Sequence, residues 1–354
     1  MEGETRDESK LRNGFQDGLI PLEPLDLSKV NSIDDLVKAM SKTAFTGRKL
    51  GEAADVLEKM WNNKNCYNVL TLSGAMTVAK MGLVICDMID SGMVDCIVST
   101  GALMAHGFIE AAGMAHFKYK KGMDDKELYY QGYDRIYDTL ELEKNFDDAE
   151  FIFNKIIEKH NPDDTLYSLK INQMLGKYLK ETTNGRGVLK SAYEKNIPVF
   201  IPAFTDSEFG LDFSLLNRIR EKQNKPEYKF DPFIDIKIFT DLILEQNKKR
   251  KELGIFTIGG GVPRNWTQQI GPQADIIQKR MGDEHGGFVR FKYGVRICPE
   301  PVHWGGLSGC TYSEGVSWGK FVPEEEGGQY SEVPCDATVA WPLIVKSVLE
   351  RKKE

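Results

Sequence analysis

The chain has 354 residues, of which 41% are hydrophobic and 28% are charged, so it can bury a large core in one large domain or two and is not of the disordered class. Its 46 Lys and Arg residues against 53 Asp and Glu give a net charge of -7, and no basic stretch interleaved with aromatics occurs, which argues against nucleic acid as the main partner. The first residues lack a cationic start followed by an apolar stretch, and there is no run of about 18 apolar residues, so we expect a cytoplasmic protein without a membrane partner.

Residues 1–62 are predicted to form an irregular arm and two helices. The first 25 residues are polar and then interrupted by Pro21 and Pro24, so this arm must dock elsewhere or stay mobile, and it could serve as an oligomer contact. Ser32 and the two aspartates that follow it predict a helix start. The apolar faces of the two helices comprise Ile33, Leu36, Val37 and Met40, and then Leu50, Ala53, Leu57 and Met60.

Residues 63–354 are predicted to form one α/β domain with a doubly wound, mostly parallel sheet. Short β-branched runs alternate with helical periods there, which is typical of βαβ units. The runs are NVLTL, VDCIVS, IPVFIPAF and GIFTI, and helices that cover the sheet are expected over residues 146–160, 166–179 and 234–251.

Each of these four strand runs ends in small or polar residues. The loops are Ser73-Gly74-Ala75, Thr100-Gly101-Ala102, Thr205-Asp206-Ser207 and Gly259-Gly260-Gly261. In open α/β sheets the ligand crevice lies at the carboxyl ends of the strands, where small residues let backbone N–H groups approach a phosphate or ribose. The four loops together indicate a nucleotide site, although the triple glycine alone could equally be a tight turn.

The cysteines and histidines show no metal-binding spacing. There is no CxxC pair and no His at zinc spacing, so we expect no metal site and reduced, space-filling thiols at Cys66, Cys86, Cys96, Cys298, Cys310 and Cys335.

Residues 314–320, EGVSWGK, place an acid, a flat aromatic and an amine among glycines. If this segment is extended, Trp318 and Lys320 project to the same face. Desolvation beside an apolar wall lowers the pKa of a lysine, and a neutral amine is a nucleophile toward imines and carbonyls. The alternative is a surface lysine next to a partly buried tryptophan.

GVSWGK closely resembles the EAVSWGK active-site stretch of the deoxyhypusine synthase family. Further similar motifs follow in the same order from about residue 25 to the C-terminus: MVDCIVSTGA, IPVFIPAFTD, IGGGV, YGVRI and CDATVAWPLIV. The resemblance implies a Rossmann-like NAD-binding fold, a homotetramer with active sites between paired subunits, and an N-terminal segment that can cover a neighbouring site.

The resemblance also implies roles for individual residues. Lys320 matches the catalytic lysine that forms an imine with the butyl portion of spermidine before an acceptor amine collects it. The substrate-binding residues are expected to be Glu314, Trp318, Asn265, His106 and Ser308. The residues expected to bind NAD are Ser73, Gly74, Ala75, Met76, Thr77, Thr100, Gly101, Ala102, Asp206, Gly260, Asp336 and Ala337, with Asp206 as the ribose carboxylate.

The departures from the family pattern fall on the amine-binding side. Asn265 stands where the family has its general-base histidine, and Asn cannot take a proton. The paired glutamates of the family are replaced by Ala105 and His106. Two family aspartates fall at Leu211, with Asp212 one place away, and at Leu307.

Three further residues near the inferred site have open roles. His106 or His303 could supply a base, and the alternative for each is a hydrogen-bonded structural histidine. Arg264 could bind a carboxylate-bearing substrate, or it could face solvent at a helix start.

A polyamine needs carboxylates to replace its lost hydration, and most of them are absent here. The sequence therefore predicts an NAD-dependent aminobutyl transferase with a small acceptor amine, similar to homospermidine synthase. The alternatives are a deoxyhypusine synthase that modifies a lysine of a translation factor, and a non-catalytic NAD-binding regulatory subunit.

Overall fold

The central sheet of the computed structural model, which describes residues 6–249, 251–282 and 286–352, consists of parallel strands. Its strands are β1 (Cys66–Leu72), β2 (Cys96–Ser99), β6 (Val199–Phe200), β7 (Glu252–Ile258), β8 (Phe291–Ile297) and β9 (Gln329–Val333). They lie in the order β6-β2-β1-β7-β8-β9. Counted along the chain within this sheet, that order is 3-2-1-4-5-6, as in sheets that bind dinucleotides. The predicted α/β, doubly wound, Rossmann-like fold is confirmed.

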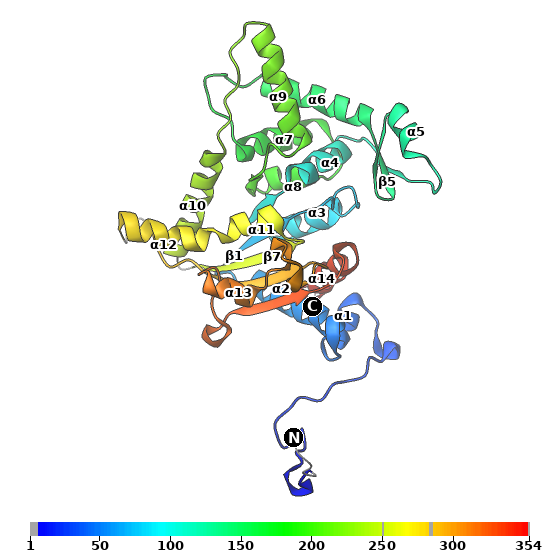
Figure 1. The fold of residues 1–354 in the computed structure, drawn as a ribbon, viewed down its shortest axis with the longest axis vertical. Coiled ribbons are helices and arrows are strands. Elements are labelled where there is room, and N and C mark those ends of the chain that lie inside the picture. Colours follow the sequence, from blue (N-terminus) through cyan, green and yellow to red (C-terminus); the bar gives the residue numbers. More distant parts are fainter. Residues whose placement is uncertain (1–5, 250, 283–285, 353–354) are drawn as a thin grey trace.

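Helices cover both faces of this sheet (Figure 1). Because side chains alternate across a strand, Leu70 and Phe256 enter one hydrophobic core while Val69 and Ile255 enter the other. Helices α2, α3, α4, α8 and α14 contribute to the first core and α10 and α12 to the second. The helices are α1 (Ile33–Ser41), α2 (Phe45–Asn62), α3 (Gly82–Asp90), α4 (Gly101–Ala111), α5 (Asp125–Tyr130), α6 (Glu143–Ile157), α7 (Ser168–Thr182), α8 (Val188–Glu194), α9 (Glu208–Lys222), α10 (Pro232–Lys248), α11 (Gly261–Gln268), α12 (Ile270–Met281), α13 (Tyr312–Ser317) and α14 (Ala337–Arg351).

The strand predicted over residues 197–204 is much shorter in the structure, where β6 spans only Val199–Phe200. Pro198 and Pro202 flank it, and proline has no N–H to donate to a neighbouring strand. The backbone N–H of Ile201 instead donates to the Ser168 hydroxyl at 2.8 Å. Strands β8 and β9 were not predicted as strands, although β8 contains the YGVRI motif.

A second, antiparallel sheet is inserted between α4 and α6, and the sequence analysis did not predict it. It contains β3 (Phe117–Lys118), β4 (Tyr133–Ile136) and β5 (Thr139–Leu142) in the order β3-β5-β4, with α5 between β3 and β4. Figure 1 shows this sheet beside α6, away from the central strands.

The predicted N-terminal helices are present as α1 and α2. Ser32 caps α1 as expected, because its hydroxyl accepts from the Asp35 N–H at 3.0 Å and the Asp35 carboxylate accepts from the Ser32 N–H at 3.1 Å. The described part of the arm, from residue 6 onward, is exposed and extends away from the rest of the chain (Figure 1).

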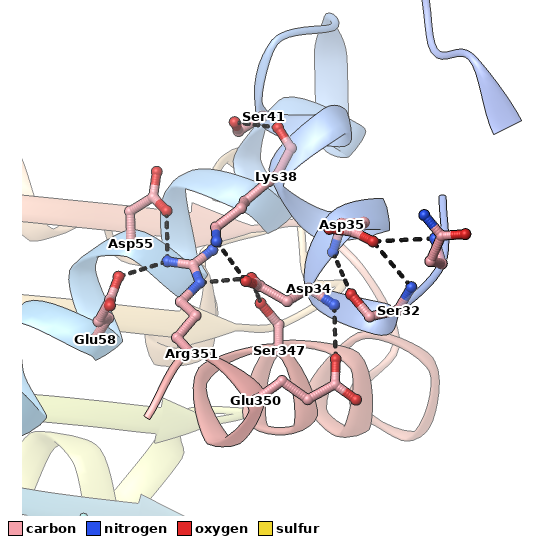
Figure 2. A network of polar contacts seen from close by, with 11 residues as sticks. Ser32, Asp34, Asp35, Lys38, Ser41, Asp55, Glu58, Ser347, Glu350 and Arg351 are labelled. Atoms are coloured by element: carbon pink, nitrogen blue, oxygen red, sulfur yellow. Dashed lines mark hydrogen bonds and ion pairs between the residues drawn. The ribbon is translucent and has the colours of Figure 1, made fainter. Parts of the chain in front are cut away.

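A buried arginine joins α1, α2 and α14 (Figure 2). Nε of Arg351 lies 2.6 Å from Asp34, and its Nη1 lies 2.8 Å from Asp55 and 2.7 Å from Glu58. Ser347 also donates to Asp34, at 2.8 Å. Burial raises the pKa of Asp34, but hydrogen bonds from Lys38, Arg351 and Ser347 outweigh burial and hold the pKa below its ordinary value.

All six cysteines are free, as predicted, and four of them are buried. Among the described residues, no helix combines the length and the apolar character that crossing a membrane requires.

Candidate active site

Lys320 follows a tight turn at the end of α13. Residues 314–320 are therefore not extended. The prediction that Trp318 and Lys320 project to the same face of a strand assumed an extended segment, so it does not apply. Trp318 is the C-cap residue of the helix, and Gly319 turns the chain with φ of 66°, a conformation that favours glycine. The N–H of Lys320 then donates back to the Gly315 carbonyl at 3.0 Å.

The turn still brings the Lys320 amine beside Trp318, with Nζ 5.6 Å from the ring centroid. The amine also donates to Oδ1 of Asn265 at 3.1 Å, from the first turns of α11. Burial lowers the pKa of Lys320, and the positive charge of Arg264 lowers it further. Both effects increase the fraction of neutral, nucleophilic amine at a given pH.

A pocket of about 260 Å³ lies in front of this amine. Four of the predicted site residues line it: Lys320, Trp318, Glu314 and Asn265. Its other walls come from α11 and from residues 310–315. The indole of Trp318 is 65% exposed, so one wall of the pocket is open in the single chain.

The crevice predicted from the strand-end loops falls at the carboxyl ends of β1 and β7, the adjacent strands from which the strand order runs in opposite directions. The backbone N–H of Gly260 donates to the Ser73 hydroxyl at 2.9 Å, which joins the ends of these two strands. A Cβ on Gly259 would stand 2.2 Å from the Ser73 hydroxyl, and one on Gly260 would stand 2.5 Å from Cα of Ser308, so only glycine fits at both positions. This close approach is typical of the switch point at which dinucleotides bind.

The neighbouring loop carries an unsatisfied polar group. Thr100 precedes α4, and its hydroxyl is buried without a hydrogen-bond partner in the described structure. Gly101 starts the helix and packs so closely on Ser207 that a Cβ would approach within 2.3 Å of the serine Cβ. A helix N-terminus with an unpartnered hydroxyl suits a phosphate or ribose oxygen.

The remaining predicted cofactor residues border the same edge of the sheet, because each follows a parallel strand. Asp206 is exposed after β6. Asp336 caps α14, where its carboxylate accepts from the Thr338 N–H at 2.8 Å and Ala337 is the first helical residue. Thr77 is buried, and its hydroxyl donates to the Leu103 carbonyl at 2.7 Å. Gly74, Ala75 and Met76 form the loop between Ser73 and Thr77.

Comparison with known proteins identifies the family. The family model for deoxyhypusine synthase matches residues 35–348. "Probable deoxyhypusine synthase 2" of Methanosarcina acetivorans is 34% identical over 332 residues, which cover 94% of this chain and 90% of that protein. "Deoxyhypusine synthase-like protein" of Chlorobaculum parvum is 34% identical over 328 residues, which cover 92% and 88% of the two chains. The chain belongs to the deoxyhypusine synthase family.

A solved structure supports the family fold. A crystal structure from Entamoeba histolytica, assigned as a deoxyhypusine synthase, superposes with a TM-score of 0.60 at 16% identity. The match covers 93% of this chain and 97% of the other.

Within this deoxyhypusine synthase fold, two predicted substrate residues lie outside the Lys320 pocket. Ser308 lies in a short 3-10 turn, Leu307–Gly309, against Gly260 of the nucleotide crevice. The side chain of Leu307 is outside the described structure. His106 lies on α4 and is 6% exposed, and its Nδ1 is 3.2 Å from the Glu141 carboxylate. His303, the other candidate base, is exposed next to Trp304.

Arg264 does not face solvent, so that alternative is wrong. It is 3% exposed, donates to the Cys310 carbonyl at 2.7 Å and lies over the Tyr312 ring. Its place at the pocket wall puts a fixed positive charge near Lys320.

The structure also assembles carboxylates that the sequence analysis did not foresee. Leu211 is 67% exposed, whereas Asp212 is partly buried on α9. Burial raises the pKa of Asp212 to about 7, with further contributions from the negative charges of Glu150 and Glu208. A cation that binds beside these groups would relieve their mutual repulsion. Glu208, on the first turn of α9 and two residues after Asp206, was the residue in the sequence that could have indicated this group of carboxylates.

Proposed function

We propose that this member of the deoxyhypusine synthase family is an NAD-dependent aminoalkyl transferase that works through an imine on Lys320. The observation that carries the proposal is the Lys320 amine: its pKa is lowered, and it is oriented by Asn265 in a pocket lined by Trp318 and Glu314. An amine in this state can attack the carbon of a donor imine, displace a diamine and retain the alkyl group as its own imine.

The crevice at the switch point fits NAD. Ser73, Gly260 and the first turn of α4 would hold its phosphates and ribose, and Asp206 would accept from ribose hydroxyls. Bound NAD would supply the hydride acceptor for oxidation of the donor amine and, once reduced, the hydride donor for reduction of the product imine. The buried Thr100 hydroxyl, which has no hydrogen-bond partner among the described residues, supports this assignment.

We propose a small amine as the acceptor, as in homospermidine synthase. The pocket of about 260 Å³ favours a slender acceptor, and Asn265 cannot serve as a base. Glu314 would pair with the cationic end of the donor, and Trp318 would contact it through the ring face.

A homotetramer with sites between paired subunits would complete this pocket. Trp318 is 65% exposed and Trp304 is 70% exposed in the single chain, and a second subunit would cover large aromatics of this kind.

Two alternatives follow from specific features. The open wall at Trp318 could admit the lysine of a translation factor, as in deoxyhypusine synthase itself. The asparagine at position 265 favours a non-catalytic NAD-binding regulatory subunit, whereas the desolvated Lys320 argues against it.

One assay separates these functions. The purified protein and a Lys320→Ala variant are incubated with NAD, spermidine and a panel of small diamines, and NADH and new polyamines are measured by mass spectrometry. A new polyamine that is absent with Lys320→Ala supports the transferase and names its acceptor. If the product forms only with a protein acceptor, deoxyhypusine synthase replaces the small-amine function. If neither product, NADH nor a borohydride-trapped Lys320 adduct forms with any donor, the regulatory subunit is the correct function.

A further inference from the structure

Three potential metal ligands converge beyond the nucleotide crevice. His106 lies on α4, His116 in the loop that follows α4, and Glu141 on β5 of the inserted sheet. Oε2 of Glu141 is 2.5 Å from Nε2 of His116 and 3.2 Å from Nδ1 of His106, and these two nitrogens are 3.4 Å apart. The side chains are 0% exposed for Glu141 and His116 and 7% for His106.

We propose that His106, His116 and Glu141 bind one divalent transition-metal ion, with Zn²⁺ as the first candidate. Two imidazole nitrogens and a carboxylate form a donor set that Zn²⁺ and Fe²⁺ take in proteins. A tetrahedral ion with bonds of about 2.1 Å holds its ligand atoms about 3.4 Å apart. Two of the three separations, 3.2 and 3.4 Å, match this spacing, and a small shift of the His116 ring opens the third.

The groups around the three ligands also suit an ion. Nε2 of His106, the nitrogen that faces away from the cluster, lies 3.6 Å from Glu208, whose other carboxylate oxygen is buried without a hydrogen-bond partner in the described structure. Asn145 donates to the second oxygen of Glu141 at 2.5 Å. Carboxylates behind a ligating histidine and donors behind a ligating carboxylate orient metal ligands in the same way.

One neighbour competes with the ion. Nζ of Lys80 lies 3.0 Å from Nδ1 of His116, so this nitrogen accepts from Lys80 and Nε2 carries the proton that faces Glu141. Metal binding requires the other tautomer of His116: the proton leaves Nε2 and one binds Nδ1, so the imidazole stays neutral and Nδ1 no longer accepts from Lys80. Lys80 can then turn fully to Glu110, which it already contacts at 3.2 Å.

The ion would link the inserted sheet to α4. Glu141 belongs to the β3-β5-β4 sheet, and His106 belongs to the helix whose first turn borders the nucleotide crevice. The sequence analysis missed the site because His116 and Glu141 approach His106 only after the inserted sheet has formed.

Metal content tests the proposal without an activity measurement. The full-length protein is stripped with a chelator and dialysed against Zn²⁺ or Co²⁺, and bound metal is measured by mass spectrometry. We expect one equivalent per chain, visible absorption bands with Co²⁺, and a higher melting temperature with Zn²⁺. Glu141→Gln and His116→Gln, which retain size and hydrogen bonding, should each weaken binding by about a hundredfold or more.

Two further variants sharpen the test. His160→Gln changes a partly exposed histidine that lies outside the cluster and contacts the Asp164 carbonyl, so the metal content should stay unchanged. Lys80→Asn should tighten binding, since it removes the competing ammonium and Asn tolerates the φ of 63° at this position.

Two results would overturn the proposal. One is a wild-type protein that retains less than about a tenth of an equivalent of either ion, which would show that the cluster is only a hydrogen-bonded triad. The other is wild-type metal content in Glu141→Gln and His116→Gln variants whose circular dichroism shows them to be folded.

Discussion

Asn265 accepts a hydrogen bond from Lys320, with 3.1 Å between Oδ1 and Nζ. An amide oxygen orients an amine as a carboxylate does, but it lacks the negative charge with which a carboxylate would favour the protonated lysine. The residue at this position therefore holds the nucleophile in place, and proton transfer has to come from another group or from water.

Lys320→Ala should abolish formation of the imine and lower turnover by about a thousandfold or more, because the nucleophile is lost. Borohydride reduction in the presence of NAD and spermidine, followed by intact mass measurement, checks this prediction. Lys320→Arg retains the charge and should be equally inactive, since a guanidinium stays protonated. An adduct on Lys320→Ala would contradict the assignment.

Asn265→Asp should move the acid limb of the rate profile to higher pH. The new carboxylate would favour the charged form of Lys320 and raise its pKa, so the neutral amine would appear only at higher pH. Below that pKa, activity should fall about tenfold for each unit of increase. Gln269→Glu adds the same charge on the same pocket wall without the contact to Nζ, and it should shift the profile less.

Thr100→Val should weaken NAD binding by about fivefold to tenfold without loss of stability. The Thr100 hydroxyl has no partner in the described structure, so its removal costs the protein no hydrogen bond. Calorimetric titration with NAD and thermal melting of the free protein measure both quantities. Thr71→Val is the control, because it removes a buried hydroxyl that is bonded to Thr257 at 2.9 Å. It should lower the melting temperature and leave NAD affinity unchanged.

Asp212→Asn should stabilise the protein by about 1–3 kcal/mol at pH 8 and have little effect at pH 4. The pKa of Asp212 is raised to about 7 in the folded state, so folding favours its protonated form. Stability is therefore lost as the pH rises from about 4 to about 7. Urea unfolding at several pH values tests this, with the exposed Asp241→Asn as control. Parallel curves for the wild type and Asp212→Asn would refute the prediction.

Arg351→Met should destabilise the protein by about 3–5 kcal/mol, because it leaves Asp34 buried without its guanidinium. The pKa of Asp34 is lowered in the folded state, so its contribution is complete above about pH 4 and is lost as the pH falls below that value. Asp34→Asn should accordingly lose less stability at low pH than at pH 7. Lys346→Gln removes an exposed pair on the same helix and should cost less than about 0.5 kcal/mol.

Local patterns in the sequence were sufficient to predict four of the six strands that the structure describes in the central sheet. Runs such as NVLTL and GIFTI are buried on both faces of the sheet. Each is followed by small residues, which mark the loop that contains Ser73 and the loop that contains Gly260. The EGVSWGK motif likewise predicted Lys320 and Trp318 as neighbours, although the backbone between them is a helix end and not a strand.

Features that depend on distant segments could not be predicted in the same way. Arg264 is buried because Tyr312 and the Cys310 carbonyl cover it, 46 or more positions along the chain. The contact between His106 and Glu141 requires strand pairing in β3-β5-β4, whose short strands carry little periodicity. The raised pKa of Asp212 also depends on Glu150, which belongs to another helix.

The pairing of Asp34 with Arg351 has a consequence for the order of events during synthesis, since 317 positions separate them. A ribosome releases α1 long before α14, and α2 packs on β8 and β9, which also emerge long after α2. The buried carboxylate of Asp34 must therefore stay hydrated until the final turn of α14 has emerged. The N-terminal helices can form early, but this domain closes only after α14 has left the ribosome.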